Sequence, residues 1–153
     1  MVIKVMPEDL AWKSTIAPTE RMAVISITNK LDEVVAFPEN PNVIEIYRMK
    51  FDDEVSSEKN GPVQSDFDGL KEFADSIIGK ADTLIVHCAA GMSRSPAVAE
   101  ALVKYFRDEE VEYVEPDYPH KRNPLVYSLA CRELGIEESQ GRQRGNNVES
   151  VKG

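Results

Sequence analysis

The sequence predicts a single α/β domain with a central, mainly parallel sheet flanked by helices. Apolar runs typical of buried strands alternate with segments of helical spacing, a pattern that indicates helices packed on the faces of a sheet. The chain has 153 residues, 42% of them hydrophobic, which is enough to bury one sizeable core. We expect residues 1–136 to form this domain, and the polar residues 137–153 to form a disordered tail.

Four strands are predicted from short runs of apolar and β-branched residues that end at polar breaks or turns. They cover residues 1–5, 22–28, 43–51 and 83–86, with the first at an edge of the sheet. We assign no regular element to residues 7–21. The charged segment 108–122 is interpreted as a surface connection or a continued helix with a break.

Three helices are predicted where apolar residues recur at helical spacing. They cover residues 67–78, 96–105 and 124–134. Ser65 and Asp68 resemble a capping box before the first helix, and Gly79 and Gly135 stand where the first and third helices should end. The second and third helices each open with a proline, which suits the first helical turn because no backbone donor is needed there.

Charge and cysteine content narrow the function classes. The formal net charge is −9, which argues against nucleic acid or an anionic membrane as a partner. The sequence has no apolar run of membrane-spanning length and no signal-peptide pattern at its start. Its two cysteines are far apart and give no disulfide framework, so we expect a cytoplasmic protein. Neither histidine has the spacing of a metal ligand, and we expect no metal or other cofactor.

The most informative stretch is Thr83–Ser95, which reads as a buried strand, a loop of small residues and the start of a helix. The free N–H groups of such a loop, together with the helix dipole, make an anion-binding site. Cys88 stands at the strand end of the loop and Arg94 at its helix end. The guanidinium can fold back onto an anion's oxygens, and the positive field favours a thiolate beneath the anion. A thiolate in that position is a nucleophile.

His87–Ser95 is similar to the His-Cys-x5-Arg-Ser/Thr signature of the cysteine-dependent protein tyrosine and dual-specificity phosphatases, in their compact form. The resemblance implies that Cys88 is the nucleophile and that Arg94 and the loop bind phosphate. It also implies that Ser95 hydrogen-bonds the sulfur and assists its departure, besides any role as a helix cap. The loop residues that would present N–H groups to phosphate are Ala89, Ala90, Gly91, Met92, Ser93 and Arg94.

The same resemblance requires a general acid, an aspartate some thirty-odd residues before the cysteine. Phe51-Asp52-Asp53 follows a predicted strand at that distance and is similar to the acid segment of the compact phosphatases. Neighbouring side chains on an extended segment point opposite ways, so only one of the two should face the site. We favour Asp53, with Asp52 as the alternative.

Two residues would support the loop in the resembled family. His87 would order it from behind through backbone hydrogen bonds, while Asn123 would brace it or cap the last helix. Cys131, on the last predicted helix, is either a core residue or a redox partner of Cys88.

The sequence therefore predicts a phosphoprotein phosphatase that hydrolyses phosphotyrosine, with phosphoserine and phosphothreonine as further substrates, through a cysteinyl-phosphate intermediate. The loop interior contains no lysine, which disfavours an inositol phospholipid substrate. The alternatives are a catalytically weak module that binds phosphorylated residues and a phosphatase for a non-protein phosphate ester. The expected partner is a phosphorylated protein or a small phosphate ester.

Overall fold

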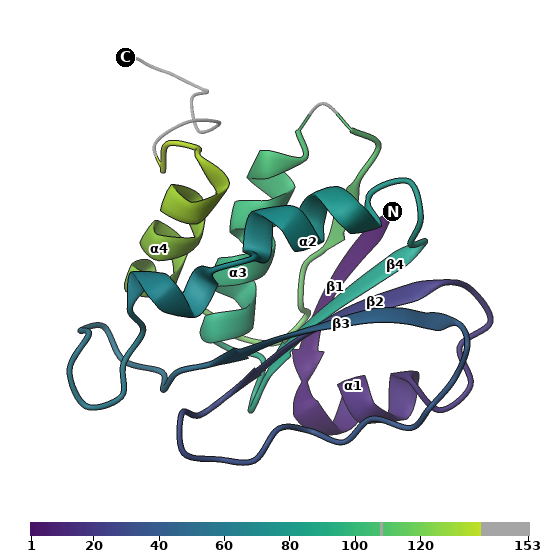
Figure 1. Cartoon of the computed structure of the whole chain (residues 1–153), viewed down its shortest axis with the longest axis horizontal. Coiled ribbons are helices and arrows are strands. Elements are labelled where there is room, and N and C mark those ends of the chain that lie inside the picture. The colour runs from purple at the N-terminus through teal and green to yellow at the C-terminus, as the bar shows by residue number, and fades with distance from the viewer. Residues whose placement is uncertain (108, 139–153) are drawn as a thin grey trace.

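The structure, a computed structural model, describes residues 1–107 and 109–138. Within these residues, five parallel strands form one sheet in the order β3-β2-β4-β1-β5, flanked by four α-helices (Figure 1). The strands are β1 (Val2–Pro7), β2 (Met22–Thr28), β3 (Val43–Lys50), β4 (Thr83–Cys88) and β5 (Glu112–Val114). The helices are α1 (Glu8–Ser14), α2 (Leu70–Ile77), α3 (Arg94–Tyr105) and α4 (Pro124–Leu134), with a short 3-10 helix, η1 (Gln64–Phe67). The predicted α/β fold with a parallel sheet is confirmed.

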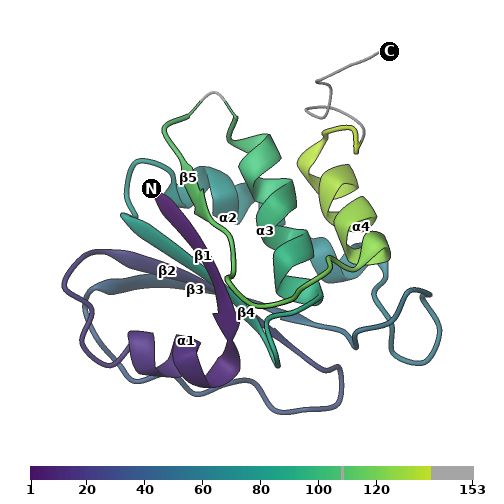
Figure 2. The same ribbon diagram turned by 180° about the vertical axis from the view of Figure 1, so that it is seen from behind.

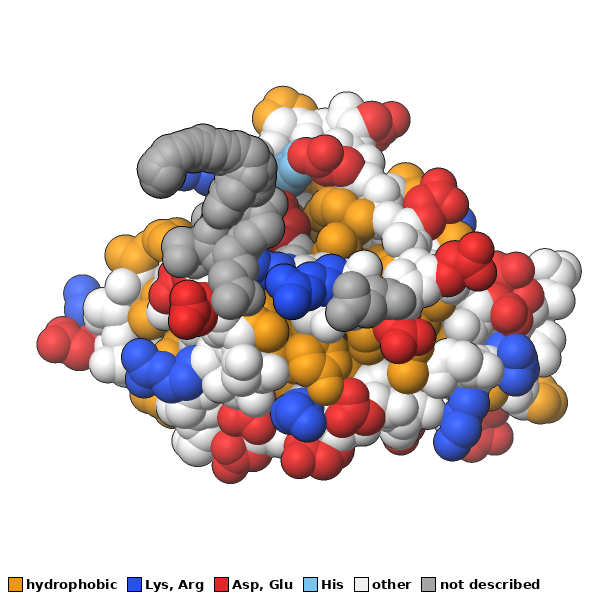
Figure 3. Space-filling view, turned by 90° about the horizontal axis from the view of Figure 1, so that it is seen from above, with side chains coloured by type: hydrophobic (Ala, Val, Ile, Leu, Met, Phe, Trp, Pro, Cys, Tyr) orange, Lys and Arg blue, Asp and Glu red, His pale blue; other side chains and the backbone are white. Residues whose placement is uncertain are grey.

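The helices divide unequally between the faces of the sheet. α2, α3 and α4 cover one face and α1 covers the other, as two opposite views show (Figures 1 and 2). The larger core lies beneath α2, α3 and α4, and a small cluster of Ala11, Met22, Val24 and Ile85 lies under α1. Viewed from the side of α2–α4, acidic and basic side chains are interspersed over the surface (Figure 3).

The central strand, β4, positions the stretch that the sequence singled out. All six of its residues are buried, and it pairs with β1 on one side and with β2 on the other. In the register, Val86 lies between Val5 and Ile25. Because all strands run the same way, the carboxyl ends of β2, β3 and β4 meet at one edge of the sheet, where such folds place their ligands.

Three elements, β1, β5 and α1, differ from the prediction because tertiary contacts decide them. β1 is not an edge strand, because β5 pairs with it on the side away from β4. β5 itself lies within residues 108–122, which were predicted as a connection or a helix; only three residues long, it has no periodicity to read. Residues 7–21, which were given no element, contain the short helix α1.

The predicted helix over residues 67–78 is divided into η1 and α2. Gly69 has a φ of 89° and stands at the N-terminus of α2, so the backbone turns there in a conformation that favours glycine. The predicted capping box, Ser65 with Asp68, is two residues too late, because the carboxylate of Asp66 accepts the N–H of Val63 at 2.9 Å. At the other end of the chain, residues 139–153 of the predicted tail lie outside the described residues.

No helix in the described part of the chain is both long enough and apolar enough to cross a membrane.

Replacing Phe67 with alanine should lower the free energy of unfolding by about 3–5 kcal/mol. Its side chain is fully buried and stacks on Phe51 with ring centroids 5.3 Å apart, so truncation leaves a cavity at the base of the acidic loop. Urea denaturation measures the loss. Leu31→Ala, at a position that is 83% exposed, is the matched control and should change stability by less than about 0.5 kcal/mol. Equal losses in the two variants would contradict this packing.

Candidate active site

The loop between β4 and α3 curls back on itself with its carbonyl groups turned outward. Four carbonyls accept hydrogen bonds from outside the loop: Ala89 from the Glu8 N–H at 3.1 Å, Gly91 from the Tyr118 hydroxyl at 2.9 Å, Met92 from the Lys121 N–H at 2.9 Å and Ser93 from the Asn123 N–H at 3.0 Å. A trans peptide unit points its N–H away from its carbonyl, so the N–H groups of the residues that follow face the inside of the loop. Within the described residues, no N–H of positions 89–93 donates to another protein group.

Gly91 makes this curl possible. Its φ of 72° lies in the left-handed region, and a side chain there would meet backbone atoms of Met6 and Pro7 at 2.8 and 2.9 Å. The loop therefore packs directly against the end of β1, which leaves space only for a hydrogen atom on the Gly91 α-carbon.

Cys88 is buried at the base of the loop, with 3% of its surface exposed. Its Sγ lies 3.2 Å from the Oγ of Ser95, in the first turn of α3. Behind it, His87 is fully buried, with Nδ1 3.0 Å from the Cys88 carbonyl oxygen and Nε2 2.6 Å from the Ser26 hydroxyl. The histidine thus links the last peptide of β4 to the neighbouring strand β2. Burial lowers the pKa of His87, which favours the neutral ring.

Arg94 is held by one nitrogen only. Its Nη1 donates to the Asn29 side-chain oxygen at 2.9 Å and to the Phe51 carbonyl at 2.8 Å. The residue is 5% exposed, and its Nε–H is buried without a partner among the described residues. The Nε and Nη2 edge of a guanidinium is the fork that binds two oxygens of an anion, and a buried unpaired donor is unfavourable until it finds an acceptor.

These features together suit a tetrahedral oxyanion. Inward N–H groups, a guanidinium edge and the start of α3 supply donors and positive potential around one point. Cys88 is buried at the start of the same loop, with its Sγ beside the first turn of α3. Chemically, the arrangement can hold an oxyanion in contact with a nucleophile.

The structure separates the two candidate acids. Asp53 turns toward the loop, where its Oδ1 accepts from the Ser93 hydroxyl at 3.0 Å and from the Asn123 amide at 2.8 Å. Its other carboxyl oxygen has no partner within the described residues. Asp52 turns the opposite way, and its Oδ1 accepts the N–H of Lys30 at 3.0 Å. Only Asp53 is therefore in contact with the loop that contains Cys88.

Asn123 has both of the contacts that the sequence left as alternatives. Its side-chain oxygen accepts the N–H groups of Leu125 and Val126 and so caps α4, while its amide donates to Asp53 and to the Glu54 carbonyl at 3.0 Å. Its own N–H holds the Ser93 carbonyl, as described above. One side chain thus fixes the helix, the loop and the carboxylate relative to one another.

Sequence reasoning missed two residues of the site. Asn29, which directly follows the predicted strand over residues 22–28, holds Arg94; its place just after β2, beside the central strand, is the available signal. Tyr118 has no local signal, because its contact with Gly91 depends on how the chain returns after β5. Burial, and then the charge of Cys88, raise the pKa of the Tyr118 hydroxyl, so it remains a donor.

Cys131 is buried on α4, about two turns after the N-terminal end at which Asn123 braces the loop. Burial raises the pKa of its thiol, as expected of a core cysteine. Among the described residues, no group of three or more histidine, cysteine, aspartate or glutamate side chains is arranged to hold a metal ion.

Comparison with known proteins finds no matching family model and no matching curated protein.

Gly91→Ala should destabilise the protein much more than Gly79→Ala. Both positions have positive φ, 72° and 81°, so each alanine has a backbone cost of about 1–2 kcal/mol. Only Gly91 also faces backbone atoms, whereas an added carbon at Gly79 meets nothing within 4 Å. Urea denaturation compares the two variants, and equal losses would mean that the loop does not pack against β1 as described.

His87 should make stability fall as the pH drops below its ordinary pKa of about 6.5. Burial lowers the pKa of the folded ring, so the unfolded chain binds a proton at a higher pH and acid favours unfolding, by up to about 1.4 kcal/mol per pH unit. Unfolding free energies measured from pH 7 to 5.5 should show a smaller slope for His87→Gln than for the wild type. Identical slopes would contradict a neutral, buried His87.

Proposed function

We propose that the protein is a phosphatase that hydrolyses phosphate monoesters through a cysteinyl-phosphate intermediate. The observation that carries this proposal is the buried Arg94, whose unpartnered Nε–H adjoins a loop with inward N–H groups above the Cys88 sulfur. A phosphate group supplies the acceptors that these donors lack.

In the proposed first step, the Cys88 thiolate attacks phosphorus in line with the ester oxygen. The sulfur–phosphorus bond forms as the phosphorus–oxygen bond breaks, and the leaving oxygen takes a proton from the Asp53 carboxyl group. Asp53 suits this role because Ser93 and Asn123 hold one of its oxygens and leave the other open. Arg94 and the loop N–H groups stabilise the charge on the equatorial oxygens.

In the second step, water attacks phosphorus and gives a proton to the Asp53 carboxylate. The sulfur–phosphorus bond breaks, which releases phosphate and restores the thiolate. The Ser95 hydroxyl, 3.2 Å from the sulfur, donates a hydrogen bond that stabilises the departing thiolate.

Phosphotyrosine is the substrate that we favour, with phosphoserine and phosphothreonine turned over more slowly. Three loops at this edge of the sheet each present an exposed apolar side chain: Leu31 is 83% exposed, Val55 70% and Met92 50%. Such side chains around the loop suit an aromatic ring better than the short polar stem of a phosphoserine. A phosphorylated protein is the proposed partner. A cysteine that must stay reduced favours the cytoplasm.

The test is hydrolysis of an aryl phosphate with a metal chelator present. Cys88→Ser should abolish turnover, and vanadate should inhibit the wild type. Asp53→Asn should lower kcat by about 10²–10⁴-fold. Asp52→Asn is the matched control. The Asp52 carboxylate accepts the N–H of Lys30 and does not contact the loop, so this variant should retain most of the activity.

Each outcome decides between specific alternatives. Turnover that survives Cys88→Ser would refute the mechanism, and a larger loss with Asp52→Asn would transfer the acid role to Asp52. If a phosphotyrosine peptide binds in an Arg94-dependent way but is never hydrolysed, the protein is a binding module. Faster turnover of a phosphoserine peptide than of the same peptide with phosphotyrosine would overturn the favoured substrate.

A further inference from the structure

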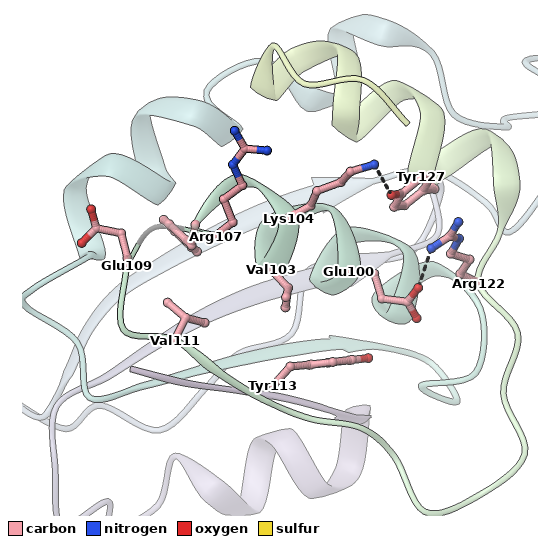
Figure 4. Close-up of a pocket in the computed structure, with 10 residues that line it drawn as sticks. Glu100, Val103, Lys104, Arg107, Glu109, Val111, Tyr113, Arg122 and Tyr127 are labelled. Atoms are coloured by element: carbon pink, nitrogen blue, oxygen red, sulfur yellow. Dashed lines mark hydrogen bonds and ion pairs between the residues drawn. The ribbon is translucent and has the colours of Figure 1, made fainter. Parts of the chain in front are cut away.

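A second cavity lies apart from the candidate active site, between α3, α4 and the segment that leads into β5 (Figure 4). Its volume is about 440 Å³, within the range of sites that hold small organic molecules. None of the residues that line it belongs to the loop 89–93 or to the acidic segment that contains Asp53.

One side of the cavity is apolar. Val103 on α3 and Val111 and Tyr113 on the opposite segment face the same space (Figure 4). Phe106 also lines the cavity. The Tyr113 hydroxyl is buried and has no hydrogen-bond partner among the described residues. Burial and the nearby Glu100 raise the pKa of this hydroxyl, so it stays protonated and can donate. An apolar wall with one unpaired donor suits an amphipathic ligand.

The rim carries a local excess of positive charge. The charged residues that line the cavity are three basic ones, Lys104, Arg107 and Arg122, and two acidic ones, Glu100 and Glu109. The chain as a whole has a net charge of −9. Arg122 is engaged, since it pairs with Glu100 at 2.7 Å. Arg107 forms no ion pair with a described residue. An excess of one positive charge matches a monoanion such as a carboxylate better than a phosphate monoester, whose charge is close to −2 at neutral pH.

We infer that this cavity is a second binding site, one that takes a small apolar carboxylate. The apolar body lies against Val103, Val111 and Tyr113, and the carboxylate lies toward Arg107. The inference goes beyond the proposed phosphatase activity and does not depend on it, because the cavity and the reactive loop have no residue in common.

The probe is 2-naphthoate, titrated into the full chain carrying Cys88→Ser and followed by amide chemical shifts in NMR. We expect saturable shifts at Val111 and Tyr113, with a dissociation constant below about 1 mM, and binding of the uncharged 2-naphthamide about tenfold weaker. Arg107→Glu should weaken 2-naphthoate binding by about tenfold or more, because it reverses an exposed charge at the rim. The matched control, Arg132→Glu on α4 outside the cavity, should leave binding unchanged.

Three results would overturn the inference. One is the absence of saturable shifts at the cavity up to about 10 mM 2-naphthoate. Another is shifts confined to residues 89–94, which would place the carboxylate in the candidate active site. The last is equal binding of 2-naphthoate and 2-naphthamide, or no effect of Arg107→Glu. Either result would mean that the cavity does not recognise the carboxylate charge. The titration uses a protein without its nucleophile, so a failure of the phosphatase proposal would not alter its outcome.

Discussion

The candidate site depends on the anchoring of loop carbonyls to groups outside the loop. Each peptide unit is rigid and planar, so a carbonyl that is fixed outward turns the following N–H inward. Four such carbonyls are fixed by four separate parts of the chain: the start of α1, Tyr118, Lys121 and Asn123. A loop of small residues alone does not define an anion site. Here the surrounding structure occupies four loop carbonyls, and the N–H groups of positions 89–93 have no partner among the described residues.

The candidate site also needs groups that are far apart in the sequence to lie close together, and the parallel strands achieve this. β2, β3 and β4 end at the same edge, so Asn29, Phe51 and Cys88 lie around one point although 59 positions separate the first from the last. Arg94 then joins the ends of β2 and β3 through a single nitrogen. Groups at the ends of β2 and β3 hold Nη1, so the edge formed by Nε and Nη2 is available for a ligand.

Local patterns in the sequence were sufficient for the strand, loop and helix around Cys88, and for β2 and α4, because burial and capping leave a signal within a few residues. They were not sufficient for β5 or α1, which are short and are fixed by contacts with β1 and with the opposite face of the sheet. Asp52 and Asp53 illustrate the same limit. The alternation of side chains along the strand predicts that the two point apart, but which one faces the loop depends on Ser93 and Asn123, 40 and 70 positions away.

Residues 121–123 connect the two sites. The backbone N–H groups of Lys121 and Asn123 hold the loop between β4 and α3. The Arg122 side chain between them points away, onto Glu100 and the Tyr127 ring, whose centroid is 3.7 Å from the guanidinium carbon. Glu100 belongs to α3, the helix that Arg94 begins. The Arg122 ion pair therefore fixes residues 121–123 to α3, the helix that begins at Arg94. Arg122 also lines the second cavity. A displacement of its side chain in the cavity would reach the loop through the N–H groups of Lys121 and Asn123, which hold the loop carbonyls. Among the described residues, Arg107 has no such link to the loop.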